Sequence, residues 1–178
     1  MLYVALLRGI NVGGKNMIRM VDLKASFEAG GFDEVSTYIA SGNVLFRAPR
    51  SSSAALSRRI EGMLTKAFGY RASIVLRTHP QMRAVVDGAP SGFGASTYRS
   101  DVFFLKEPLG AASVIRAVPI RQGVDELYPG KGVVYSSRLA RRATQSRINR
   151  VASLPLYQSM TIRSWSTTTK LLQLMDEL

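Results

Sequence analysis

The sequence predicts an α+β fold of two ferredoxin-like halves with antiparallel sheets, followed by a C-terminal helix. Residues 1–78 carry apolar patterns in the order strand, helix, strand, strand, helix, strand, which is the ferredoxin-like unit. Residues 79–178 loosely repeat that order, although the two halves do not visibly match in sequence. The 178 residues are 46% apolar and 20% charged, as in a globular chain. We therefore expect two ferredoxin-like subdomains, at residues 1–78 and 79–178.

Local signals place the elements of the first half. The apolar run at 2–7 predicts a strand, the glycines within 9–16 predict a loop, and Met20, Leu23 and Phe27 predict a helix that stops at Gly30-Gly31. Alternation over 34–40, which puts Ile39 on the side of Val35, a Ser41-Gly42 turn and a strand at 43–46 predict a hairpin. Serines at 51–53 predict the cap of a helix closed by Gly69, and a strand at 74–76 follows. The expected inner face of that helix is Leu56, Ile60, Met63 and Ala67.

The second half begins with a short helix at 79–86 and a loop at 87–96. A strand at 102–105, a helix at 111–117 and a hairpin of 126–128 with 133–136 around Pro129-Gly130 follow. Residues 144–153 predict a helix with Ile148 and Val151 facing inward. The chain should end in a helix from about residue 167 that aligns Leu171, Met175 and Leu178, with Ser166 or Thr167 as its cap.

The composition excludes several chemistries. With no Cys and one His, the chain has no disulfide framework, no thiol nucleophile and no multi-histidine metal centre, so we expect neither a metal nor a cofactor. No segment is long and apolar enough to be a signal peptide or a membrane span, which predicts a cytoplasmic protein without a membrane partner. The sequence leaves the oligomeric state open.

The charge favours an anionic partner. The chain has 24 basic and 12 acidic residues, a net charge of +12 shared equally by the two halves. No acidic residue lies between Glu126 and Asp176, a stretch that includes Arg138, Arg141, Arg142, Arg147 and Arg150. Arginine supplies forked donors for phosphate or carboxylate groups. The alternative for these arginines is an ordinary solvated surface.

The loop after the first strand nearly matches a phosphate-binding loop. Residues 9–16 read Gly-Ile-Asn-Val-Gly-Gly-Lys-Asn, so Asn16 stands where G-x-x-x-x-G-K-[ST] requires a hydroxyl. The helical pattern also starts too late, near Met20, for a nucleotide-hydrolysing loop. Beside that disfavoured loop, two interpretations remain: a simple anion nest of the Gly13 and Gly14 amides with Lys15 and Arg8, or a plain glycine-rich turn.

Three blocks resemble a known bacterial family, the one named domain of unknown function 1697. They are residues 5–16 (Ala-Leu-Leu-Arg-Gly-Ile-Asn-Val-Gly-Gly-Lys-Asn), 37–44 (Thr-Tyr-Ile-Ala-Ser-Gly-Asn-Val) and 161–167 (Thr-Ile-Arg-Ser-Trp-Ser-Thr). The resemblance implies two ferredoxin-like halves and no particular activity. Ser164 departs from the family, which usually has Asn at that place, so a site that used the Asn would be altered here.

If the three blocks converge, they form a cationic, polar site for an anion. Its members are Arg8, Asn11, Gly13, Gly14, Lys15, Ser41, Asn43, Arg163, Trp165 and Thr167. The set contains no carboxylate, His or Cys, so it suits binding better than proton-transfer catalysis. Each member also has a structural interpretation, as a turn, a cap or an anchor.

We expect first an anion-binding module for nucleic acid or another phosphorylated ligand, without catalysis. The alternatives are an enzyme or sensor for a small phosphorylated or carboxylated ligand at the glycine loop, and a protein-interaction domain. The sequence itself decides neither the ligand nor whether any reaction is catalysed.

Overall fold

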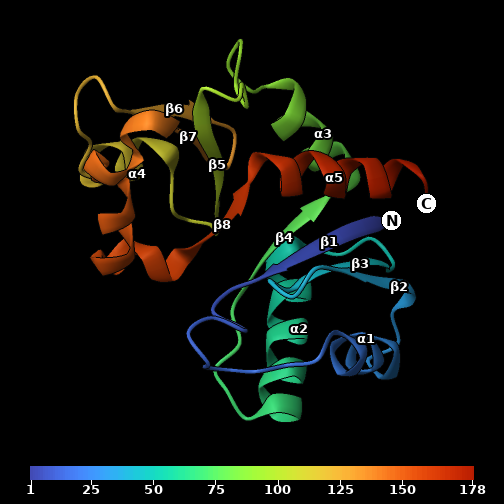
Figure 1. Cartoon of the computed structure of the whole chain (residues 1–178). Coiled ribbons are helices and arrows are strands. Elements are labelled where there is room, and N and C mark those ends of the chain that lie inside the picture. The colour runs from blue at the N-terminus through green and yellow to red at the C-terminus, as the bar shows by residue number, and fades with distance from the viewer. The chain divides into compact units, whose positions relative to one another are not determined.

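The computed structural model describes all 178 residues and divides into two compact units (Figure 1). The first unit comprises Met1–Gln81 together with Leu174–Leu178, and the second comprises Met82–Gln173. Each unit contains one four-stranded antiparallel sheet, which confirms the predicted α+β fold of two ferredoxin-like sheets with a C-terminal helix.

The elements of the first unit follow the ferredoxin-like order. They are β1 (Leu2–Leu7), α1 (Met20–Ala29), β2 (Asp33–Tyr38), β3 (Asn43–Arg47), α2 (Ser53–Phe68) and β4 (Ile74–Thr78). Their strands lie in the order β2-β3-β1-β4, so β1 and β3 are central. α3 (His79–Asp87) follows β4 directly and leads into the second unit.

The second unit repeats this topology with one change. Its elements are β5 (Tyr98–Leu105), α4 (Ala111–Ala117), β6 (Asp125–Gly130), β7 (Val133–Leu139), three 3₁₀ helices, β8 (Met160–Ser164) and α5 (Trp165–Asp176). The sheet order β6-β7-β5-β8 equals that of the first unit, strand for strand. The 3₁₀ helices η1 (Ala140–Gln145), η2 (Ile148–Ser153) and η3 (Pro155–Ser159) stand where the first unit has α2.

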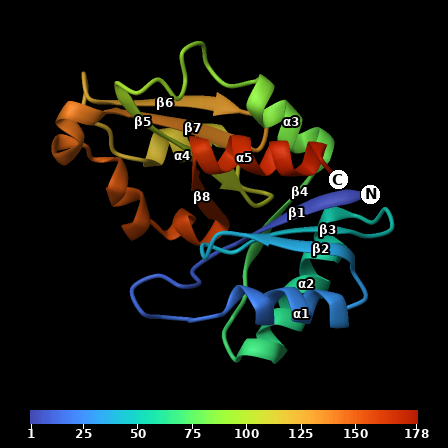
Figure 2. The ribbon, with the colours of Figure 1, turned by 45° about the vertical axis from the view of Figure 1, so that its right-hand side comes forward.

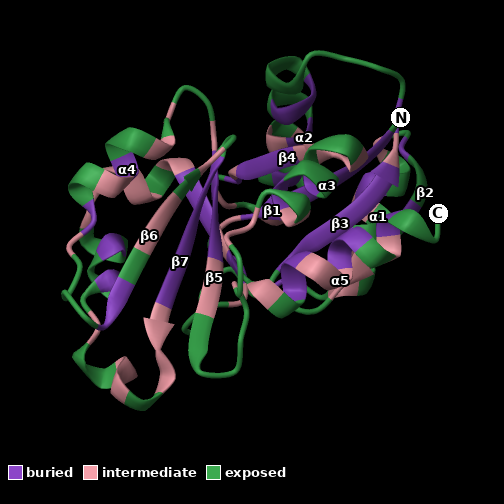
Figure 3. Ribbon diagram, turned by 90° about the horizontal axis from the view of Figure 1, so that it is seen from above, coloured by how far each residue is buried: buried purple, intermediate pink, exposed green.

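The helices of the first unit cover one face of its sheet, as Figures 1 and 2 show. Alternate residues of β1 point to this face and pack with Phe27 of α1 and with Ile60 and Leu64 of α2. Ser52 caps α2 by accepting a hydrogen bond from the Ala55 N–H, and Gly69 ends it at φ 68°. Figure 3 shows that the central strands of this sheet, β1 and β3, are buried along almost their whole length.

The inner face of α2 differs by one residue from the prediction. Leu64 is fully buried and Ala67 is exposed, because Leu56, Ile60 and Leu64 repeat every four residues. Met63 packs at the margin of the core, as a partly buried residue.

Two predicted turns are also displaced. Ile39 is not in β2 but begins a four-residue turn at φ 50°, and its side chain is exposed. In the second unit, Lys131 and Gly132 form the turn of the β6–β7 hairpin, while Pro129 and Gly130 pair with β7. Proline is accommodated there because β6 is an edge strand that needs no N–H donor on its outer side.

The helix predicted at 144–153 is wrong in type and right in its inner face. The segment forms η1 and η2, but Ile148 and Val151 are buried as expected. These residues pack with Phe103 of β5 and Val114 of α4 in the core of the second unit. β8 was not predicted from the sequence, α5 begins at Trp165, and Leu178 is exposed rather than aligned with Leu171 and Met175.

Candidate anion-binding sites

The connection from β1 to α1 is a small β-hairpin. Val12 and Lys15 form an antiparallel bridge in which the Lys15 N–H donates to the Val12 carbonyl at 3.1 Å. Gly13 and Gly14 between them have φ 58° and 74°, the two positive values of a type I′ turn. α1 starts only at Met20, so no helix N-terminus stands behind the glycines as it does in a phosphate-binding loop.

Two asparagines hold this hairpin in place. The Asn11 amide donates to the carbonyls of Ile18 (3.0 Å) and Ala40 (2.8 Å), and its oxygen accepts from the Ile18 N–H (2.7 Å). Asn16 donates to the Gly9 carbonyl at 2.8 Å. Both residues have positive φ, which asparagine tolerates better than most residues. Asn16, the residue that departs from the phosphate-loop pattern, therefore makes a contact to the backbone and does not act as a metal ligand.

The second block supports the first. The Asn43 side chain is fully buried and donates to the Tyr38 carbonyl at 2.8 Å and to the Ser41 hydroxyl at 3.1 Å, which closes the turn between β2 and β3. Gly42 has φ 81°, and a Cβ there would lie 2.5 Å from the Ile10 side chain. Because Asn11 bonds to Ala40 of the same turn, the first two blocks meet within the first unit.

The third block forms β8 and the first turn of α5, in the second unit. Arg163 is buried, and its guanidinium donates to the Thr161 hydroxyl (2.7 Å) and the Ile162 carbonyl (2.9 Å). Burial lowers the pKa of Arg163 to about 10. The Ser164 hydroxyl accepts from the Thr167 N–H at 3.2 Å, so Ser164 caps α5. Ser and Asn are about equally good N-caps, so the Asn that the sequence resemblance implies at this place would serve the same structural role.

Trp165 anchors a loop. Its indole meets Phe93 edge to face at 5.0 Å, and Phe93 meets Tyr135 in the same way at 5.4 Å. A Cβ on Gly94 would lie 2.1 Å from the indole, so the chain at 94 passes directly over the ring. The Tyr135 hydroxyl donates to the Val85 carbonyl. The aromatic cluster thus fixes α3 and the 88–97 loop to β7 and α5.

These contacts show which of the predicted site residues already have partners within the protein. Asn11, Ser41, Asn43, Trp165 and Thr167 have structural partners, Gly13 and Gly14 form a turn, and Lys15 is exposed at its tip. Arg8 is half-buried at the end of β1. The expectation that the third block joins the first two in one site stays a prediction.

A stronger concentration of exposed cations lies on the 3₁₀ helices of the second unit. Arg141, Arg147 and Arg150, which we call the arginine surface, are exposed, and no carboxylate or hydrogen-bonding partner engages their guanidinium groups. Arg147 and Arg150 are three residues apart, joined by an N–H to carbonyl bond of 3.0 Å, so their side chains lie on one side of η2, about 6 Å apart along its axis. Ile148 and Val151, at the same spacing, occupy the buried side.

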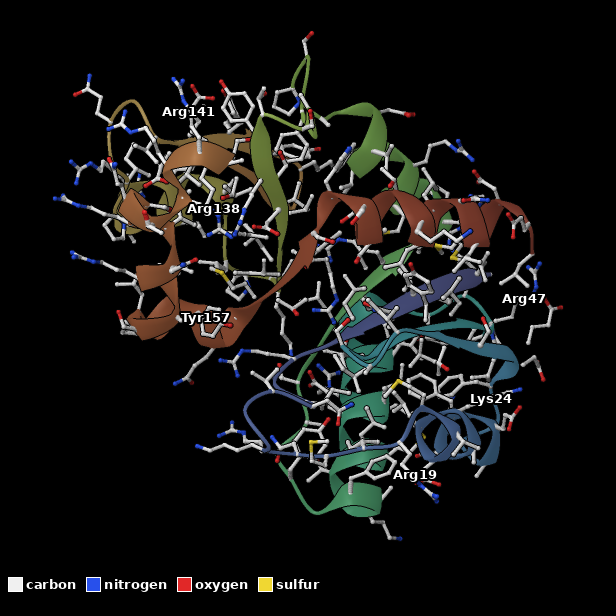
Figure 4. All side chains as sticks on the ribbon, in the orientation of Figure 1. Arg19, Lys24, Arg47, Arg138, Arg141 and Tyr157 are labelled. Atoms are coloured by element: carbon white, nitrogen blue, oxygen red, sulfur yellow. The ribbon has the colours of Figure 1, made fainter.

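Asp125 is buried and holds the backbone that carries the arginine surface. The sequence did not indicate this role. The Asp125 Oδ2 accepts the N–H groups of Arg121 and Arg147, both at 2.8 Å, while its Oδ1 is buried without a hydrogen-bond partner. Arg138, opposite Asp125 on β7, donates to Asn149 at 2.7 Å and lies 3.5 Å from the Asp101 carboxylate. Figure 4 shows Arg138 beneath the 3₁₀ segment and Arg141 on its outside.

The burial of Asp101 raises the pKa of its carboxyl group, although Arg138 and Arg99 act in the opposite direction.

The first unit has an open, mainly apolar groove of about 510 Å³ between α1 and α2, lined by Ala29, Met63 and Phe68 among others. No group of three or more His, Cys, Asp or Glu side chains is placed to hold a metal ion. None of the helices combines the length and apolar character that crossing a membrane requires.

Comparisons with known proteins agree with this fold. Residues 1–135 match the family model described as protein of unknown function (DUF1697), which confirms the family resemblance and includes the first two of the three sequence blocks. The structure is similar to that of the conserved bacterial protein SP0830 from Streptococcus pneumoniae, with a TM-score of 0.85, 28% identity and 97% of each chain covered. No curated protein matches the chain.

Proposed function

The chain belongs to the DUF1697 family, whose description assigns no activity, and from that premise we propose that it is a binding module for nucleic acid and not an enzyme. The observation that carries this proposal is the arginine surface. Three exposed guanidinium groups without partners stand on a segment whose buried face is fixed in the core of the second unit. Such a set engages phosphates in a way that does not depend on sequence.

The fixed backbone beneath the arginine surface supports binding of an extended anion. Arg147 and Arg150 are spaced by about 6 Å along η2, and Asp125 fixes the backbone of Arg147. The backbone that carries these arginines therefore loses little conformational entropy when a ligand binds, although each exposed side chain still has to be ordered. Successive phosphates of one strand lie at comparable intervals, whereas a small monoanion would engage only one or two of the three side chains.

The glycine loop gives less support to a small-ligand enzyme. Its hairpin geometry offers no helix N-terminus, and the polar side chains of Asn11 and Asn16 are committed to backbone carbonyls. The loop supplies one exposed cation, Lys15. A site for general acid–base chemistry would need a titratable group there, and residues 8–19 contain no carboxylate, His or Cys.

A salt titration tests the proposal. Fluorescence anisotropy of a labelled duplex DNA should show binding at about 50 mM salt with a Kd in the range of about 10⁻⁴–10⁻⁶ M, weakening linearly in a plot of log Kd against log salt. Replacing Arg141, Arg147 and Arg150 together by Ala removes up to three phosphate contacts. The slope of log K against log salt should then be less steep by about 2.7.

The matched control removes three exposed arginines of the first unit, Arg50, Arg58 and Arg71, which also have no side-chain partner. It changes the net charge by the same amount and should reduce the slope much less. Equal effects of the two triple variants would show that net charge alone accounts for the binding, and would refute a site at the arginine surface. Absence of any binding at low salt would refute the proposed function altogether.

A further inference from the structure

The connection between β1 and α1 is longer than the fold requires. It comprises residues 8–19, twelve in all, whereas the equivalent connection of the second unit, between β5 and α4, comprises residues 106–110, only five. Both connections join the first strand of the same topology to its first helix. The additional residues of the first unit form the hairpin around Gly13 and Gly14, so the hairpin is an addition to the ferredoxin-like unit rather than part of it.

This hairpin is held by its own hydrogen bonds and extends outward. Asn11 makes three side-chain hydrogen bonds, Asn16 makes another, and the Asn11 N–H donates to the Asn16 carbonyl at 3.1 Å. Figure 2 shows the connection leaving the end of β1 and extending to one side of the sheet and helices of its unit before it returns to α1. Loops that are long and well ordered in this way commonly carry function.

The chemistry of the hairpin suits a surface that is both apolar and anionic. Val12 at its tip and Met17 at its base are 66% and 71% exposed, the two largest values among the large apolar side chains that the structure exposes. Lys15 stands between them, and no acidic residue precedes Asp22 in the chain. A negatively charged partner with apolar features in a recess would complement all three side chains.

Its dimensions fit a groove of duplex DNA. The hairpin consists of two residue pairs, Asn11 with Asn16 and Val12 with Lys15, which gives it a reach of about 7 Å. The major groove of B-form DNA is about 12 Å wide and 8.5 Å deep and admits a two-stranded ribbon, whereas the minor groove is about 6 Å wide. Thymine methyl groups and guanine acceptors line the major groove, and they match Val12 and Lys15 in kind.

We propose that the hairpin at residues 11–16 enters the major groove of B-form DNA, with Val12 and Met17 on apolar base edges and Lys15 on acceptors. This inference rests on the proposed function and names its partner. A-form RNA has a deep, narrow major groove that side chains do not reach. The protein should therefore bind a DNA duplex more tightly than an RNA duplex of the same sequence.

The test compares two labelled duplexes of about 20 base pairs, two helical turns, one of DNA and one of RNA. The wild-type protein should prefer the DNA by about tenfold, since a few apolar and polar groove contacts are worth roughly one factor of ten. Val12→Ser with Met17→Ser should abolish that preference without changing the slope of log K against log salt. The control, Val21→Ser with Ile120→Ser, changes two other exposed apolar side chains and should keep the preference.

Methylation interference locates the contact directly. Guanine N7 lies in the major groove and adenine N3 in the minor groove, so methylation at N7 should weaken binding of the wild type by up to about tenfold and should not weaken binding of the Val12→Ser, Met17→Ser variant. Equal affinity for the two duplexes, an unchanged preference in that variant, or interference confined to adenine N3 would each overturn the hairpin inference and leave the proposed function intact. Failure to bind either duplex at low salt would overturn both.

Discussion

Replacing Asn11 separates a structural role from a ligand-binding role at the most constrained residue of the hairpin. Asn11→Ala removes two donors and one acceptor that serve the carbonyls of Ile18 and Ala40 and the Ile18 N–H. It also places an alanine at φ 52°, in the left-handed region. Asn11→Gly removes the same hydrogen bonds but accepts that backbone angle without strain.

The expected losses follow from these contacts. Three hydrogen bonds at about 1 kcal/mol each give about 3 kcal/mol for either variant. The left-handed angle adds about 1–2 kcal/mol for alanine. Asn11→Ala should therefore lower the free energy of unfolding by about 4–5 kcal/mol and Asn11→Gly by about 3 kcal/mol, against a total of about 5–15 kcal/mol for a typical domain.

Urea unfolding followed by circular dichroism measures both values, because the single tryptophan, Trp165, lies in the second unit and is a poor reporter on the first. Lys15→Ala, in the same hairpin, has no side-chain contact to lose and should stay within about 0.5 kcal/mol of the wild type. A loss below about 0.5 kcal/mol for Asn11→Gly would refute the structural assignment. Reduced anion affinity at unchanged stability would show instead that Asn11 contacts the ligand.

Three further changes test other parts of the structure. Ser164→Ala should lower the free energy of unfolding by about 1 kcal/mol, measured by thermal unfolding, because α5 loses its cap. Ser164→Asn should stay within a few tenths of a kcal/mol of the wild type, and equal losses in the two variants would exclude capping. Gly42→Ala should destabilise more than Gly13→Ala. Both positions bear the left-handed strain of about 1–2 kcal/mol, but a Cβ at 42 also meets Ile10 at 2.5 Å, whereas position 13 has open space; equal losses would show that packing at 42 is unimportant. Burial raises the pKa of Asp101, so the folded protein binds the proton of this carboxyl group more tightly than the unfolded chain does. The group therefore adds stability as the pH falls through its folded pKa, and this contribution is absent above that pKa. Asp101→Asn should remove that contribution from a plot of melting temperature against pH, and identical acid profiles of variant and wild type would contradict it.

Most of the fold was accessible from the sequence because its signals are local. The apolar run of β1, the cap at Ser52 and the glycines after α1 and α2 each fix an element within a few residues. The errors occur where two structures share one pattern. Ile148 and Val151 are three residues apart, a spacing that fits an α-helix and a 3₁₀ helix alike, and β8 is a five-residue strand that carries Arg163 among its buried residues.

The candidate site was less accessible, because residue type does not reveal a side chain's partner. Asn11 and Asn43 resemble ligand contacts in the sequence, yet their amides bond to carbonyls of residues up to 29 positions away. Asp125, next to Glu126, has the appearance of an ordinary surface acid. Only the pairing of β6 with β7 buries it and directs its carboxylate to the N–H groups of Arg121 and Arg147.

The sequence by itself determined the two ferredoxin-like halves, the family and the cationic character of the chain, since apolar periodicity, turn residues and net charge are properties of neighbouring residues or of composition. The tertiary structure alone decided which of the polar residues are committed to backbone groups and which, like Lys15 and the arginine surface, remain exposed. That decision depends on contacts between distant segments. The folded chain must pair nearly every buried polar group, and the partner it finds is set by strand register and packing rather than by sequence spacing.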